Sequence, residues 1–109
     1  MSETEFLQLA EESLSAIENA LDAHHDVLDV ECSRQGNVLE IEFIDSGSKV
    51  IVNIQAAMQE LWVAARSGGF HYRHDGQHWQ DTREHGELFA MLSRIVSEQG
   101  GVSVQLQPA

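Results

Sequence analysis

The sequence predicts an α+β fold: a two-layer sandwich in which an N-terminal and a C-terminal helix pack on one face of an antiparallel sheet of about six strands. Near both ends of the chain, apolar residues recur at intervals of three and four, which is the period of a helix with one buried face. Between these regions they alternate at intervals of two, with turn-forming residues between the alternating stretches. Two helices that each bury one face can share one side of such a sheet, which leaves the other side to solvent or a partner.

The first predicted helix covers residues 6–21. Its apolar face consists of Phe6, Leu9, Ala10, Leu14, Ile17 and Leu21. Ser2 or Thr4 is expected to cap its start, because a hydroxyl oxygen can accept a hydrogen bond from a free backbone N–H of the first turn.

The alternating stretches predict strands within residues 28–33, 39–43, 49–55 and 60–66, followed by a hairpin of "GFHYRH" and "HWQD". "RQGN" and "IDSGSK" supply turns, so the first three strands should form an antiparallel meander. A second helix is predicted from about His85 to Glu98, with "GG" ending it. The tail "VSVQL" alternates again. The whole chain, residues 1–109, is expected to form one domain.

The composition narrows the class of function. Eighteen acidic and six basic residues give a formal charge of −12, which argues against binding nucleic acid or an anionic membrane through charge. Cations and basic protein surfaces are the natural partners. Cys32 is the only cysteine, so the chain has neither an internal disulfide nor a CxxC pair. The N-terminal sequence lacks the pattern of a signal peptide, and we expect a cytoplasmic protein.

Five acidic residues form a predicted surface that we call the acidic ridge: Glu11, Glu18, Asp22, Asp29 and Glu31. The first three share one flank of the first helix, at about 100° per residue. The other two should lie on the outer face of the following strand, and both sets form one surface if that strand is the sheet edge beside the helix. Carboxylates suit hard cations such as Fe³⁺ and, less well, Fe²⁺, Mn²⁺ or Ca²⁺. No spacing converges four ligands, so the prediction is weak, exposed binding; the alternative is a set of ordinary solvated acids.

Three residues beside the ridge are further candidate metal ligands: His24, His25 and Asp26. An imidazole there could join a cation site or titrate near neutral pH. The alternative is that the histidines are polar residues at a fraying helix end. Cys32 has the strand parity of the core, so we expect a buried side chain rather than a nucleophile.

Trp62 is the candidate centre of a protein contact. In the strand 60–66, Leu61 and Val63 share one face, whereas Trp62 and Arg66 share the other, which suggests that the indole lies on the helix-free side. The same parity places Asn53 and Gln55 on that side. Aromatic residues among polar ones often anchor protein interfaces. The alternative is that the helices cover this face and that Trp62 is part of the core.

The stretch "SGSKVIVNIQAAMQELWVAARSGGFHYRHDGQHWQDTREHGELFAML" closely resembles the signature region of the frataxin family, and the whole chain is similar to bacterial members. The combination of G-S-K, a hydrophobic run, N-x-Q, L-W-V-A and S-G-G-F-H-Y is specific. The resemblance implies the same α–β sandwich that the periodicities predict.

The resemblance also implies a function. It is weak iron binding on the acidic ridge and regulation of iron–sulfur cluster assembly, through binding of the cysteine desulfurase and the scaffold assembly proteins. The residues placed at partner contacts are Glu18, Asp22, Asn53, Gln55 and Trp62. His24 and His25 stand where relatives often carry acids or a tryptophan, so nitrogen ligands could favour softer divalent ions here.

No enzymatic activity is expected, and the expected state is a monomer, with metal-induced oligomers as an alternative. Two further functions stay open. One is a protein-interaction module whose metal binding is incidental. The other is an iron chaperone or ferroxidase, which would need a di-iron site; the paired Glu-x-x-His motifs that build one between helices are missing from the sequence.

Overall fold

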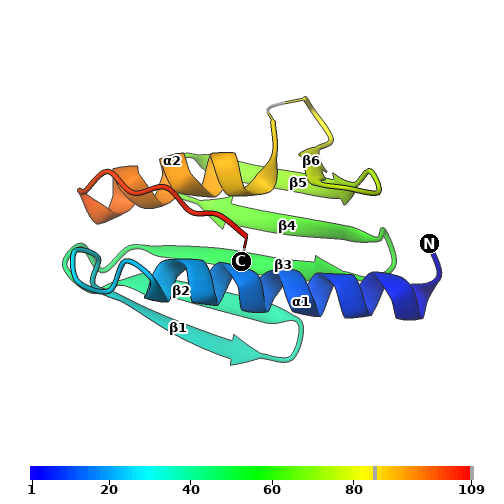
Figure 1. Ribbon diagram of the computed structural model, residues 1–109, viewed down its shortest axis with the longest axis horizontal. Coiled ribbons are helices and arrows are strands. Elements are labelled where there is room, and N and C mark those ends of the chain that lie inside the picture. Colours follow the sequence, from blue (N-terminus) through cyan, green and yellow to red (C-terminus); the bar gives the residue numbers. More distant parts are fainter. Residues whose placement is uncertain (85, 109) are drawn as a thin grey trace.

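The structure is a computed structural model that describes residues 1–84 and 86–108. Its elements, in chain order, are α1 (Glu3–Asp22), β1 (Val30–Gln35), β2 (Val38–Phe43), β3 (Lys49–Gln55), β4 (Glu60–Ala65), β5 (Gly68–His74), β6 (Trp79–Asp81) and α2 (Leu88–Gly100) (Figure 1). All six strands form one sheet in sequence order, and every neighbouring pair is antiparallel. β1 is therefore an edge of the sheet.

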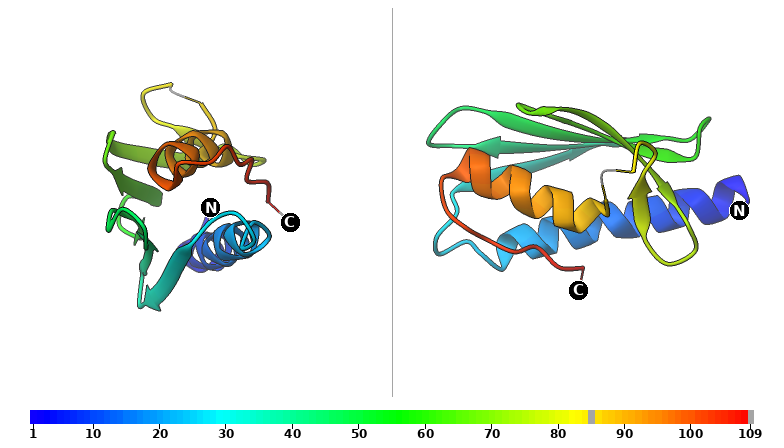
Figure 2. Two further views of the ribbon diagram at one scale, coloured as in Figure 1. Left: turned by 90° about the vertical axis from the view of Figure 1, so that its left-hand side faces the viewer. Right: turned by 90° about the horizontal axis from the view of Figure 1, so that it is seen from above.

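The two helices lie side by side on one face of this sheet, and the opposite face carries no helix (Figure 2). The predicted fold class is confirmed. β3 coincides with the predicted strand "KVIVNIQ", and its register on β4 pairs Asn53 with Trp62. Leu61 and Val63 are buried against the helices, so the alternating side chains of β4 lie on the helix-free face, as their parity predicted. Trp62 is half-buried there.

The first helix begins where the sequence predicted a cap. The Ser2 hydroxyl accepts a hydrogen bond from the Glu5 backbone N–H at 3.1 Å, and the Glu5 carboxylate accepts from the Ser2 backbone N–H at 3.1 Å. This reciprocal pair satisfies two backbone donors and fixes the start of α1. The buried residues of α1 are Phe6, Ala10, Leu14, Ile17, Ala20 and Leu21. The predicted apolar face is therefore confirmed, except that Leu9 is only partly buried.

β1 starts later than predicted. After α1 the backbone turns, with the Val27 and Leu28 N–H groups both bonded to the His24 carbonyl, and the ladder begins at Val30. Cys32 has the predicted parity, but it is half-buried rather than fully buried. The reason is its position on an edge strand, which has a neighbour on one side only.

The second helix is displaced toward the C-terminus. Its predicted start, at about residue 85, lies outside the described residues, and the helix itself begins at Leu88 with the Glu87 carboxylate accepting hydrogen bonds from the first-turn N–H groups. Gly101 ends it in the left-handed conformation, with φ 71°. No helix in the described part of the chain is long and apolar enough to cross a membrane.

The tail after α2 returns alongside the two helices, on the side away from the sheet (Figures 1 and 2). Its alternation is real, because Val104 and Leu106 are buried, but it forms no strand. The hydroxyls of Ser97 and Ser93 replace a neighbouring strand: each accepts a tail N–H, from Val104 at 3.0 Å and from Leu106 at 2.8 Å respectively.

Candidate metal and partner surfaces

The ridge carboxylates on α1 lie beside a basic residue that the sequence analysis did not include, Arg34 of β1. Its side chain lies on the helix-facing side of the strand, between two ridge carboxylates of α1. Nη1 donates a hydrogen bond to Glu18 Oε1 at 3.1 Å, and Nη2 is paired with Glu11 Oε2. Glu11 and Glu18 therefore share an internal cation, and a metal ion would have to compete with it for both carboxylates.

The next ridge residue along α1, Asp22, borders a surface hollow of about 330 Å³ between α1 and β1. Glu18, His25 and Cys32 also line this hollow. Burial, followed by the nearby charges of Glu18 and Asp22, raises the pKa of the Cys32 thiol to about 11. At neutral pH the group is a thiol and a poor ligand, because metals bind the thiolate.

The two adjacent histidines have different partners. The His24 Nε2 atom lies 3.0 Å from the Gln105 carbonyl oxygen and joins the C-terminal tail to the end of α1. The His25 Nδ1 atom lies 2.9 Å from the Asp22 carbonyl oxygen. Since a carbonyl only accepts, each bonded nitrogen carries a proton, which leaves Nε2 as the His25 ring atom that could coordinate a metal ion. Among these two, His25 is the one that lines the acidic hollow.

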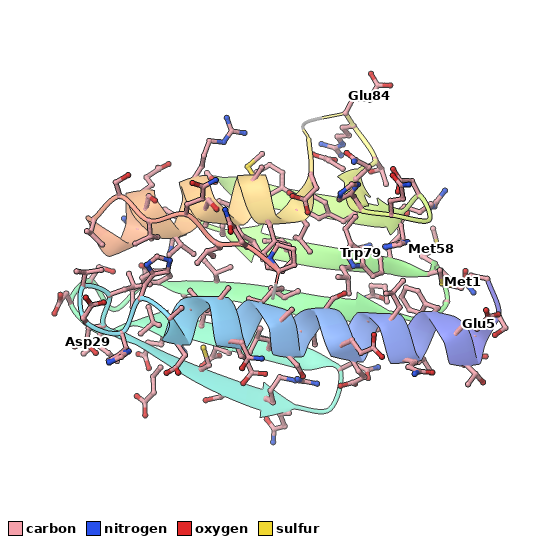
Figure 3. The ribbon with its side chains drawn as sticks, in the orientation of Figure 1. Met1, Glu5, Asp29, Met58, Trp79 and Glu84 are labelled. Carbon is pink, nitrogen blue, oxygen red and sulfur yellow. The ribbon has the colours of Figure 1, made fainter. Side chains whose placement is uncertain are left out.

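The remaining ridge residues lie elsewhere. Asp29 precedes β1 at the end of the molecule where α1 ends, opposite to the end that holds Met1 and Glu5 (Figure 3). Together with Asp26 and Asp45 it borders a second, smaller hollow.

Glu31 alternates with Val30 and Cys32, so its side chain lies on the helix-free face, where its cross-strand partner is Glu42. β1 thus separates Glu31 from the carboxylates of α1, so the expectation that all five ridge acids form one surface is wrong for this residue, although β1 is the sheet edge beside the helix. Within residues 1–84 and 86–108, no three His, Cys, Asp or Glu side chains form a group that could hold a single ion.

The helix-free face carries a compact group that we call the Trp62 cluster: Glu60, Trp62, His71 and Arg73. The Trp62 and His71 rings, directly opposite each other on β4 and β5, stack with centroids 4.2 Å apart and planes 4° from parallel. Glu60 pairs in the same way with Arg73, one row along. Its carboxylate accepts hydrogen bonds from the Trp62 indole at 2.8 Å and from the Arg73 guanidinium at 2.6 Å.

The two predicted amides of β3 extend these rows. Asn53 is the cross-strand partner of Trp62, and Gln55 is the partner of Glu60. The structure therefore brings the three predicted sheet residues Asn53, Gln55 and Trp62 together on one face. Strand parity alone would also have placed Glu60 beside them, but nothing in the sequence indicated that its carboxylate would be buried.

Comparisons with known proteins agree with this architecture. The family model described as "Frataxin-like domain" matches residues 1–102. Two similar relatives are both named "Iron-sulfur cluster assembly protein CyaY": one from Herminiimonas arsenicoxydans, 60% identical, and one from Janthinobacterium sp. (strain Marseille), 61% identical. Each alignment covers 100% of this chain and 99% of the relative.

A solved structure described as "Frataxin from Psychromonas ingrahamii as a model to study stability modulation within CyaY protein family" superposes with a TM-score of 0.89 at 29% identity. That match covers 98% of this chain and 99% of the other. The sheet, the two helices and nearly the full length are thus shared, and the chain belongs to the frataxin family.

Proposed function

We propose that this protein acts in iron–sulfur cluster assembly as a regulatory adaptor that docks its acidic ridge on a basic surface of the cysteine desulfurase and binds iron weakly on the same ridge. The observation that carries the proposal is the full-length similarity to relatives named as iron–sulfur cluster assembly proteins. The net charge of −12 supports the polarity of the contact, because opposite charges steer two proteins together.

The Trp62 face makes a second contact in this proposal, toward the scaffold assembly proteins. A half-buried indole beside the amides of Asn53 and Gln55 offers flat apolar area together with hydrogen-bonding groups. The contact therefore needs a partner with a complementary apolar group within reach of polar atoms.

Charge reversal tests the ridge contact. The double variant Glu18→Lys/Asp22→Lys should weaken desulfurase binding by about tenfold or more in a calorimetric titration at low salt. Asp22→Lys alone leaves the Arg34 pairs with Glu11 and Glu18 in place and should show part of the loss. The matched control is Glu84→Lys/Glu98→Lys, which makes the same change in net charge on exposed residues away from α1; Glu84 projects from the loop before α2 (Figure 3). Equal affinities for the two double variants would exclude the ridge as the interface.

A protein-interaction module with incidental metal binding is the second candidate, and one observation favours it. Arg34 pairs with two of the five ridge acids and offsets one of their two negative charges, which lowers the demand for an external cation. A Co²⁺ or Fe²⁺ titration followed by amide resonances separates the candidates. Selective changes at Asp22, Asp29 and Glu31 support metal binding on the ridge, whereas uniform small changes support the interaction module.

A further inference from the structure

Glu60 is a carboxylate that is nearly buried although its strand position faces away from the helices. Only 5% of its side chain is exposed, whereas the neighbouring side chains of His71 and Arg73 are 45% and 60% exposed. A buried charge is costly unless hydrogen bonds and opposite charge compensate it. The surroundings of Glu60 must therefore supply both.

The partners of Glu60 belong to the Trp62 cluster. One carboxylate oxygen, Oε1, accepts the Trp62 indole N–H at 2.8 Å and lies 3.6 Å from the His71 Nδ1 atom. The other, Oε2, accepts from the Arg73 guanidinium at 2.6 Å. The indole nitrogen is thus directed along the sheet toward Glu60, and the plane of the ring is held parallel to the His71 ring.

We propose that Glu60 is a positioning residue for the contact made through Trp62, an inference that rests on the second contact of the proposed function. The carboxylate fixes the indole in one orientation and occupies its only donor. A partner then meets the stacked Trp62–His71 pair as a preformed surface and need not supply an acceptor. Holding a side chain in its bound conformation lowers the entropy lost on binding.

A carboxylate suits this position better than an amide. Glutamine could still accept the indole N–H with its oxygen, but its NH₂ group would then lie toward the Arg73 guanidinium, donor against donor. Glu60→Gln therefore keeps the size of the side chain but leaves one acceptor oxygen for two donors, the Trp62 indole and the Arg73 guanidinium, so the pair of bonds that holds Trp62 is broken.

The first test observes Trp62 directly. The chain has two tryptophans, and the Trp79 indole donates to the Ser13 hydroxyl at 2.8 Å, so its resonance is an internal reference. In Glu60→Gln the Trp62 indole N–H should shift and exchange with solvent roughly tenfold faster, while the Trp79 signal stays in place. The control is Glu40→Gln, which removes a carboxylate from an exposed pair with Lys49 on the same sheet. An unchanged Trp62 indole signal would overturn the proposal.

If Glu60→Gln does not fold, Arg73→Gln is the second variant, because the Arg73 side chain is mostly exposed and contacts the same carboxylate. It should also shift the Trp62 indole resonance. No shift in that variant overturns the proposal as well.

The second test measures affinity for the desulfurase–scaffold assembly. Glu60→Gln should weaken binding about fivefold, and Trp62→Ala should weaken it further. The double variant should equal Trp62→Ala, since Glu60 acts through Trp62. A Glu60→Gln loss that persists in full without Trp62 overturns the positioning role. Wild-type affinity in Trp62→Ala instead overturns the proposed second contact itself, while the indole spectra still report whether Glu60 orients the ring.

Discussion

The Arg34 Nη1 atom on β1 lies 3.1 Å from the Glu18 Oε1 atom on α1, so the carboxylate at the centre of the helix flank is paired within the chain. The same guanidinium contacts Glu11. Both carboxylates are partly exposed, which limits the stability that the pairs provide. The main consequence of these pairs concerns metal binding, because a carboxylate that binds a guanidinium is not free to bind a metal ion.

Replacing Arg34 should therefore expose a cation site. In Arg34→Met, Mn²⁺ should broaden the amide resonances around Glu11 and Glu18 more than it does in the wild type. The apparent affinity for Mn²⁺ should rise several-fold. Stability without metal should fall by less than about 1 kcal/mol, as expected for partly exposed ion pairs. Arg94→Met is the control, since it removes an exposed cation from α2. Identical titrations of the two variants would contradict the competition by Arg34.

Replacing His24 and replacing His25 should have different effects on the binding of Co²⁺. His25→Ala should weaken Co²⁺ binding near Asp22, because His25 lines the acidic hollow and its Nε2 atom is the ring nitrogen that does not bond the Asp22 carbonyl. His24→Ala should leave that titration unchanged and shift the amide resonances of Gln105 and Leu106, since it releases the tail. Equal effects of the two substitutions on Co²⁺ affinity would show that the difference in their hydrogen bonds does not matter.

Cys32 should react slowly in the native protein. With its pKa at about 11, the thiolate population near pH 7.5 is about three hundredfold below that of an ordinary cysteine with a pKa of about 8.5, so iodoacetamide labelling followed by mass spectrometry should be slow until the chain is unfolded. Glu18→Gln/Asp22→Asn should accelerate labelling only modestly, because burial is the larger cause of the shift. Native labelling as fast as that of the denatured chain would contradict this prediction.

The same shift sets a dependence of stability on pH. The folded pKa of Cys32 lies above the unfolded one, so the folded state holds this proton more tightly. Its contribution to the free energy of unfolding is complete below pH of about 8.5 and is lost as the pH rises toward 11. In urea titrations across this range, Cys32→Ala should show a smaller loss of stability than the wild type.

Gly100 should not tolerate the change that usually stabilises a helix. Inside a helix, replacing glycine with alanine normally raises the stability by about 1 kcal/mol. Here a Cβ atom would lie 2.5 Å from the Cδ1 atom of buried Leu28, so Gly100→Ala should lower the free energy of unfolding by about 1 kcal/mol. In a Leu28→Val background the same substitution should cost less, because the shorter side chain leaves space. An equal cost in both backgrounds would mean that the contact is not the cause.

Local pattern was sufficient for much of the fold. The alternation in "KVIVNIQ" predicts both ends of β3, and the cap of α1 is one of the two residues predicted, Ser2 rather than Thr4, because both features depend on residues close in sequence. The position of Arg34 beside Glu11 depends on how β1 packs against α1, across 23 positions of the chain. The tail that follows α2 shows the same limit. Its alternation is compatible with a strand, and only the packing of two helices shows that serine hydroxyls take the place of one.

For the candidate site, the sequence predicted the face on which several residues lie but not their contacts. Parity places Asn53, Gln55 and Trp62 on one face, but it does not show that the Glu60 carboxylate lies between an indole and a guanidinium. Helix geometry places the carboxylates of α1 on one flank. Strand parity places Glu31 on the outer face of β1, but only the packing of α1 on the opposite face shows that the strand separates Glu31 from those carboxylates.

The edge position of β1 gives the acidic residues a second consequence, for solubility. An edge strand offers unpaired backbone groups to the edge of another molecule, and charged side chains oppose such pairing through electrostatic repulsion and hydration. Glu31 is exposed on the helix-free face of β1, and carboxylates of α1 lie beside the opposite face of the same strand. Substitutions that neutralise these acids also remove a barrier to intermolecular sheet extension. Loss of partner binding in such variants is therefore informative only when light scattering shows that the protein has not aggregated.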